Sequence, residues 1–135
     1  MKSHILMTIL LVNVPLSFSQ AESNTVNNLL QDYEKQGANT ADAEKGKQLW
    51  QKTFNNIGER SCTSCHTKDL TQNGKHIQTS KDIKPMSPFV NPERLTDSKK
   101  VNKLFKRNCK WTLGRECTAQ EKSDFLVYIE KSKKI

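Results

Sequence analysis

Apolar side chains recur every three or four residues in four segments of this chain, the spacing that places them on one face of an α-helix. The segments predict helices over residues 25–36, 41–54, 97–108 and 119–131. Gly37 follows the first segment, where a C-cap belongs, and Thr40 and Thr96 precede the second and third as N-caps. The fourth begins with Thr118 and Glu121, the two residues of a capping box.

The stretch between the second and third predicted helices is rich in glycine and proline. It has no run of alternating apolar residues long enough to predict a sheet, and the chain has no internal repeat. We therefore expect a small all-α fold of about four helices, with a long loop region in the middle of the chain.

Residues 1–21 have the pattern of a secretory signal peptide, with a basic start, an apolar stretch over residues 5–16 and small residues at the end. Cleavage after Ser19 or after Ala21 fits this pattern equally well. The apolar stretch is short and interrupted for a transmembrane helix, which leaves an uncleaved anchor as the alternative. We expect residues 22–135 to form one exported domain in the bacterial periplasm, without stable insertion in the membrane.

Only 34% of the 135 residues are hydrophobic, well below the roughly 45–50% of ordinary globular domains. A small domain with so few apolar residues usually needs a disulfide, a metal or a large cofactor to hold its core together. Disorder is the competing explanation of this composition, but the helical patterns argue against it. The composition therefore predicts a prosthetic group.

Basic residues outnumber acidic ones by 22 to 14, which gives a formal net charge of +8. They are scattered along the chain, apart from a basic tail at residues 131–134. This distribution fits either a solvated basic surface or a face that docks an acidic partner. The sequence contains no base-reading motif, and we expect no nucleic-acid partner.

Cys62, Cys65 and His66 form the C-x-x-C-H sequence that attaches haem. Two thiols three residues apart lie on one side of a helical turn, where they can add to the two vinyl groups of a porphyrin, and the next residue offers an imidazole to the iron. A zinc half-site or a thioredoxin-like redox pair is the alternative, but neither has its usual sequence context here. We predict one covalent haem c, with thioethers to Cys62 and Cys65 and His66 as the proximal ligand.

Cys109 and Cys117 are the two remaining cysteines, with seven residues between them. In an oxidising compartment we expect a disulfide, with a free thiol pair as the alternative. In the chain-entropy model so short a loop contributes roughly 2–3 kcal/mol. A dithiol–disulfide exchange activity is the weakest functional hypothesis for this pair.

The residue opposite His66 decides between an electron carrier and a ligand-binding protein. Met86 would make an ordinary His/Met carrier, but it lies only 20 residues after His66, in a proline-flanked loop. His76 is interpreted as a solvated loop residue. Asn108 continues the apolar stripe of the third helix, where a C-cap role is the ordinary interpretation and iron ligation the alternative.

Taken together, these residues resemble the sphaeroides haem protein family, small exported monohaem cytochromes, and are similar, more distantly, to cytochrome c″. The resemblance extends from about Val26 to Ile129. The matching stretches are residues 43–46 with Leu49, 61–66, 83–85, 94–97 with Val101, 107–109, 114–117 and 121–122. C-x-x-C-H alone is generic, whereas Arg-Asn-Cys at 107–109 together with Gly-Arg-Glu-Cys at 114–117 is specific. The family implies a small class I-like cytochrome c fold.

In this family the residue before the first disulfide cysteine is the distal iron ligand, which implies Asn108 here and gives Met86 no such role. A carboxamide oxygen suits Fe(III) and matches Fe(II) poorly. The resemblance therefore implies that Asn108 leaves on reduction and that the iron becomes open to O2, NO or CO. Trp111, between the two cysteines, is expected either to form part of the distal wall or to cover the disulfide.

The resemblance also implies a dihaem cytochrome c, or another redox protein, as the electron donor. It leaves open a weak reductase or peroxidase activity toward oxygen or nitrogen oxides. The alternative is a simple periplasmic electron-transfer cytochrome whose haem is permanently six-coordinate, with Met86 or Asn108 as the distal ligand.

Overall fold

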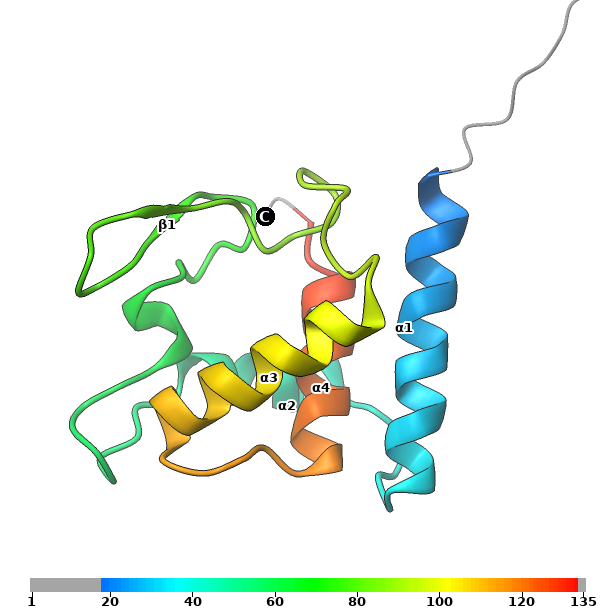
Figure 1. The fold of residues 1–135 in the computed structure, drawn as a ribbon, viewed down its shortest axis with the longest axis horizontal. Coiled ribbons are helices and arrows are strands. Elements are labelled where there is room, and N and C mark those ends of the chain that lie inside the picture. The colour runs from blue at the N-terminus through cyan, green and yellow to red at the C-terminus, as the bar shows by residue number, and fades with distance from the viewer. Residues whose placement is uncertain (1–17, 134–135) are drawn as a thin grey trace, which may run out of the picture.

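Four α-helices carry the fold of the computed structural model, which describes residues 18–133 (Figure 1). A long loop region between the second and third helices holds one 3₁₀ turn, η1, and a two-stranded antiparallel hairpin. In chain order the elements are α1 (Phe18–Lys35), α2 (Ala43–Gln51), η1 (Cys62–Ser64), β1 (Gly74–Lys75), β2 (Asp82–Ile83), α3 (Ser98–Leu113) and α4 (Ala119–Glu130). The predicted all-α class is confirmed, and the strands are too short to change it.

The crossing of α2 and α4 is the most closely packed part of the molecule. Gly46 of α2 lies against the backbone of Asp124, and a Cβ atom at this position would overlap the Asp124 carbonyl oxygen. One turn later, the Trp50 ring packs on Phe125 and Tyr128, with ring centroids 6.3 and 6.1 Å away. The glycine thus allows close backbone approach, and the tryptophan fills the adjoining space.

Helix α4 begins with the predicted capping box, in which Thr118 Oγ1 accepts from the Glu121 amide and the Glu121 carboxylate accepts from the Thr118 amide. The helix lies at the centre of the fold, and six of its residues are buried. One of these is Asp124, whose Oδ1 accepts from the Asp42 amide and from Gln120 Nε2, each at 2.8 Å. The buried carboxylate therefore ties the start of α2 to α4.

The N-caps of α2 and α3 differ from the predicted threonines. Asp42, not Thr40, caps α2, and its Oδ1 accepts from the Glu44 and Lys45 amides. Asp97, not Thr96, caps α3. A carboxylate also interacts favourably with the positive end of the helix dipole, which favours the aspartates over the adjacent threonines. Helix α2 ends at Gln51, three residues before the predicted end.

Helix α3 continues five residues beyond its predicted end and terminates at Gly114, which adopts a left-handed conformation with φ of +76°. Asn108 and Cys109 therefore lie inside the helix. The interpretation of Asn108 as a C-cap is wrong, because the helix continues for five more residues after it.

Helix α1 packs along α4 at one side of the molecule (Figure 1). Its buried face holds Val26, Leu29 and Tyr33, as the predicted stripe requires. The Tyr33 hydroxyl donates to Asn102 Oδ1 at 2.6 Å and so links α1 to α3. The first 17 residues of the predicted leader lie outside the described residues, and residues 18–21 belong to α1. Within residues 18–133 no helix has the length and apolar character needed to cross a membrane.

Candidate haem-binding site

A cavity of about 470 Å³ lies between α3 and the loop region that carries η1, β1 and β2. Its volume falls in the range of roughly 300–1,000 Å³ that is typical of cofactor pockets. Its apolar walls come from α3 and α4, through Val101, Leu104, Phe105, Phe125 and Ile129. Both helices therefore turn their apolar faces toward an interior that accommodates a large apolar group.

The three residues of the C-x-x-C-H sequence all line this cavity. The His66 amide donates to the Cys62 carbonyl at 2.9 Å, which closes the chain into one helical turn. Neither Cys62 nor Cys65 forms a disulfide with another described residue, and both are half-buried. Burial raises the pKa of the Cys62 thiol to about 12, so this surrounding favours a neutral sulfur such as a thioether.

Helix α2 packs against His66 through the Trp50 ring. The His66 ring centroid lies 5.3 Å from that of Trp50, whose Nε1 donates to the Thr67 carbonyl at 3.2 Å. Burial, together with the nearby charge of Arg94, lowers the pKa of His66 to about 4. The imidazole is therefore neutral at ordinary pH, which is the form that binds a metal ion.

The β1–β2 hairpin packs directly on the C-x-x-C-H turn. Gly74 is buried, and a Cβ atom there would overlap the Cys65 carbonyl oxygen, which accepts from the Lys75 amide at 2.8 Å. The Ile77 amide lies 3.5 Å from Cys65 Sγ. At the hairpin tip, His76 also lines the cavity, but its Nδ1 accepts from two loop amides. The hairpin thus holds the second cysteine in position.

Arg94 is a half-buried cation on the cavity wall. Its Nε donates to the Pro85 carbonyl at 2.8 Å and its Nη2 to the Lys84 carbonyl at 2.6 Å. Among residues 24–133, no carboxylate forms an ion pair with this guanidinium. Burial lowers its pKa, because the charged form is partly desolvated. A cation in this setting is suited to an anionic group of a ligand.

Both candidate distal ligands line the same cavity, but they come from different walls. Met86 lies in the loop that hydrogen-bonds to the segment after His66, since the Ser87 amide donates to the Leu70 carbonyl at 2.9 Å. Asn108 comes from α3, and its side chain is exposed to the cavity, where Oδ1 accepts from Arg107 Nε at 3.1 Å.

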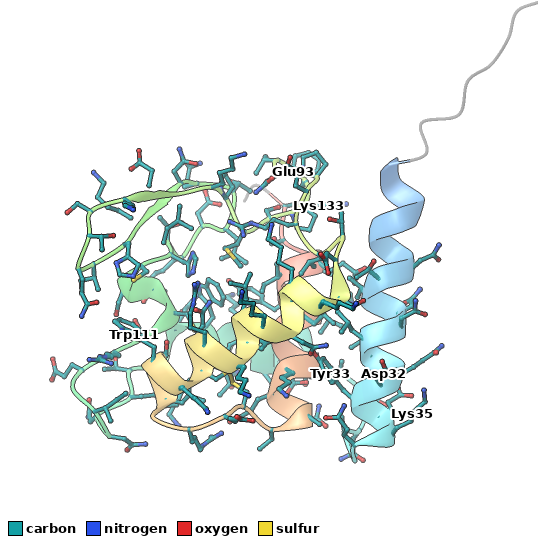
Figure 2. The ribbon with its side chains drawn as sticks, viewed as in Figure 1. Asp32, Tyr33, Lys35, Glu93, Trp111 and Lys133 are labelled. Atoms are coloured by element: carbon teal, nitrogen blue, oxygen red, sulfur yellow. A yellow bond between two sulfur atoms is a disulfide. The ribbon has the colours of Figure 1, made fainter. Side chains whose placement is uncertain are left out.

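The C-terminal end of α3 is anchored in two ways. Cys109 and Cys117 form a disulfide with Cα atoms 5.5 Å apart. Trp111 lies beside the loop that leads into η1 (Figure 2), where the Arg60 guanidinium stacks 4.4 Å from its ring centroid and donates to its carbonyl. Trp111 lines the cavity as well, so it forms part of the wall rather than covering the disulfide alone.

Sequence reasoning assigned no role to Arg94 or Arg60. A single arginine carries little signal in a chain with 22 basic residues. The position of Arg94 after a proline-rich loop was the only local clue, and the carbonyl groups that it binds belong to residues nine and ten positions earlier.

The chain is similar to known c-type cytochromes in sequence. Residues 36–129 match a protein family described as a domain of unknown function, DUF1924. The cytochrome c-type protein SHP of Cereibacter sphaeroides is 40% identical over 103 residues, which cover 75% of this chain and 79% of that protein.

Two solved structures share the fold. Oxidised SHP, described as an oxygen-binding cytochrome c, has a TM-score of 0.69 and 38% identity, over 77% of this chain and 94% of that chain. Oxidised cytochrome c″ of Methylophilus methylotrophus has a TM-score of 0.72 and 30% identity, over 85% of this chain and 97% of that chain. The likeness thus extends far beyond C-x-x-C-H, to the arrangement of the helices.

Proposed function

Because the chain belongs to the sphaeroides haem protein family, and its cofactor is therefore covalent haem c, we propose that it is an exported cytochrome that binds a diatomic gas after reduction. In this function a partner cytochrome would supply one electron to the bound haem, and Asn108 would be the ligand released so that O2, NO or CO could bind. The description of the relative SHP as oxygen-binding supports this class of ligand.

The residues around the cavity fit a haem on three separate grounds. Cys62, Cys65 and His66 share one helical turn at its wall, α3 and α4 contribute apolar side chains to the wall, and Arg94 offers a cation to a haem carboxylate. When bound, the haem supplies an iron that changes its charge by one electron and binds small gases. Neutral His66, held by Trp50, is the permanent ligand on one side.

Asn108 is the residue on which the gas-binding proposal depends. Its carboxamide lies at the cavity wall, on the helix that also lines the cavity with the apolar side chains of Leu104 and Phe105. A neutral amide oxygen is a hard, weak donor that suits Fe(III) and matches Fe(II) poorly, so adding one electron weakens its bond to the iron. The Cys109–Cys117 disulfide fixes the adjacent backbone, so that release requires only a side-chain rotation.

The decisive experiment compares Asn108→Ala and Asn108→His with the native protein. We expect Asn108→Ala to give a ferric haem that is five-coordinate or bound by water, and Asn108→His to give a low-spin ferric haem. The native ferrous protein should be high-spin and should bind CO. Absorption and EPR spectra, followed by anaerobic titration with CO, NO and O2, measure each of these properties.

Asn102→Ala is the matched control, since it removes the same side chain from the same helix at a position that does not line the cavity. It also removes the acceptor of the Tyr33 hydrogen bond, so thermal melts must show that this variant is folded. It should leave every spectrum unchanged. The competing function is a permanently six-coordinate electron carrier, which the presence of Met86 at the cavity wall favours. A native ferrous protein that is low-spin and inert to CO, together with a spectrum that changes in Met86→Leu but not in Asn108→Ala, would establish that carrier instead.

The proposed location is the bacterial periplasm, and the proposed electron donor is a dihaem cytochrome c or another redox protein. The formal net charge of +8 favours an acidic partner. Lys81, Lys100 and Arg107 are exposed and line the cavity, so part of this charge surrounds the redox site itself.

A further inference from the structure

Arg107 makes a contact that the proposed function does not use. Its Nε donates to Asn108 Oδ1 at 3.1 Å, and both side chains are exposed where they line the cavity. Consecutive residues on a helix normally point about 100° apart and do not face each other. The long arginine side chain therefore folds back toward the carboxamide of the next residue.

Two other cations near this end of α3, Lys110 and Arg115, have carboxylate partners. Lys110 pairs with Glu116 at 3.3 Å, and Arg115 forms two hydrogen bonds of 2.7 Å to the Glu121 carboxylate. Arg107 has no carboxylate partner among residues 24–133, and its one hydrogen bond to another side chain is to Asn108.

The oxygen that Arg107 binds is the atom that would ligate the iron. A charged N–H donor withdraws electron density from a carboxamide oxygen, which makes that oxygen a poorer donor to a metal ion. The same donor offers the oxygen a hydrogen bond once it is away from the metal, and charge-assisted bonds are about twice as strong as neutral ones. Both effects favour the state in which Asn108 is detached.

We propose that Arg107 is a positioning residue that competes with the iron for Oδ1 of Asn108. This inference rests on the proposed function, because it assumes that Asn108 is the distal ligand. On reduction one electron enters, the bond from Oδ1 to the iron breaks, and Arg107 Nε–H holds the freed oxygen; no proton is transferred. Arg107 thereby raises the midpoint potential and keeps the carboxamide from closing the site to gases.

The test is a double-mutant cycle between Arg107→Gln and Asn108→Ala. In the native background we expect Arg107→Gln to lower the equilibrium constant for reduction about tenfold, which is about 59 mV for one electron, and to weaken CO binding to the ferrous protein by a similar factor. In the Asn108→Ala background the same substitution should change both quantities less than about twofold. Arg107→Lys, which keeps the charge but lacks the Nε donor, should fall between these values.

Lys106→Gln is the matched control, because it removes one charge from an exposed neighbour on α3 that does not line the cavity. Its effect on the potential should be less than about twofold. Equal effects of Arg107→Gln in the two backgrounds would overturn the inference, since Arg107 would then act only through its charge on the haem. The proposed function fails separately, if Asn108→Ala alone leaves the ferric spectrum unchanged. Thermal melts of each variant verify that it is folded.

Discussion

The two sides of the molecule are built on different principles. At the crossing of α2 and α4, protein atoms fill the interior: Gly46 lies against the Asp124 backbone, and Asp124 and Leu126 are only 2% and 0% exposed. On the side of α3, the helix turns Leu104 and Phe105 toward a cavity of about 470 Å³, and Asn108 is exposed. The first region is packed by protein side chains alone, whereas the second lines a cavity that fits a cofactor.

This difference explains how a chain with only 34% hydrophobic residues forms a defined fold. The limited apolar material is concentrated around α4, which α1 and α2 both contact. The rest of the interior belongs to a porphyrin, whose faces supply apolar area that the sequence lacks. The covalent attachment at η1 then ties the loop region to the helices.

Removing the attachment has the largest expected effect. In the double variant Cys62→Ala/Cys65→Ala, without haem, we expect hydrogen-exchange protection of the α3 amides to fall at least about 100-fold, or about 2.7 kcal/mol of local stability. Amides of α2 and α4 should lose much less, since these two helices pack mainly on each other, although Phe125 and Ile129 of α4 also line the cavity. Hydrogen exchange measured by mass spectrometry distinguishes the two regions. An equal loss of protection in both would contradict the view that only the α3 side depends on the haem.

A substitution at the crossing of α2 and α4 tests the region that is packed by protein side chains. In Gly46→Ala the added methyl group meets the Asp124 backbone, which has no free side chain to move aside. We expect a loss of about 2 kcal/mol in the free energy of unfolding, within the usual range for overpacked sites. Lys47→Ala, at the exposed neighbouring position, should cost less than about 0.5 kcal/mol. Denaturant unfolding of the holoprotein compares the two, and similar midpoints would argue against close packing at Gly46.

The smallest effect concerns the loop that joins α3 to α4. The hydrogen bonds from Arg115, helped by those from Thr118, lower the pKa of Glu121. A lowered acid pKa stabilises the fold above the pKa of the unfolded chain, and this stabilisation is lost as the pH falls through the folded value. We expect Glu121→Gln to cost about 1 kcal/mol at pH 7, and the difference from the native protein to shrink below about pH 4.

Glu116→Gln is the control for this measurement, because Glu116 pairs with Lys110 at the surface and both side chains are 55% exposed. It should change the free energy of unfolding by less than about 0.5 kcal/mol at either pH. A difference for Glu121→Gln that stays constant from pH 7 to pH 3 would show that the carboxylate charge does not contribute.

The helix ends illustrate where sequence reasoning stops. Thr40 and Asp42 are both good N-caps, and so are Thr96 and Asp97. Asp42 caps α2 in a position where its amide is bound by Asp124 of α4, a residue 82 positions later. For α2 the position of the cap therefore depends on a tertiary contact as well as on the charge of the capping residue. The end of α3 is different, because Gly114 is a local C-cap signal in the sequence. The prediction ended the helix at Asn108 because the apolar stripe ends there.

The sequence by itself determined the four helices, the haem-attachment turn and the family, since these depend on periodicity, capping chemistry and the spacing of reactive side chains along a few turns. Only the tertiary structure decided that Asn108 and Met86 line one cavity, that Arg94 lines it with no carboxylate partner among residues 24–133, and that Arg107 binds the carboxamide oxygen. These contacts depend on the direction in which a loop or a side chain turns, and the spacing of residues along the chain does not determine that direction.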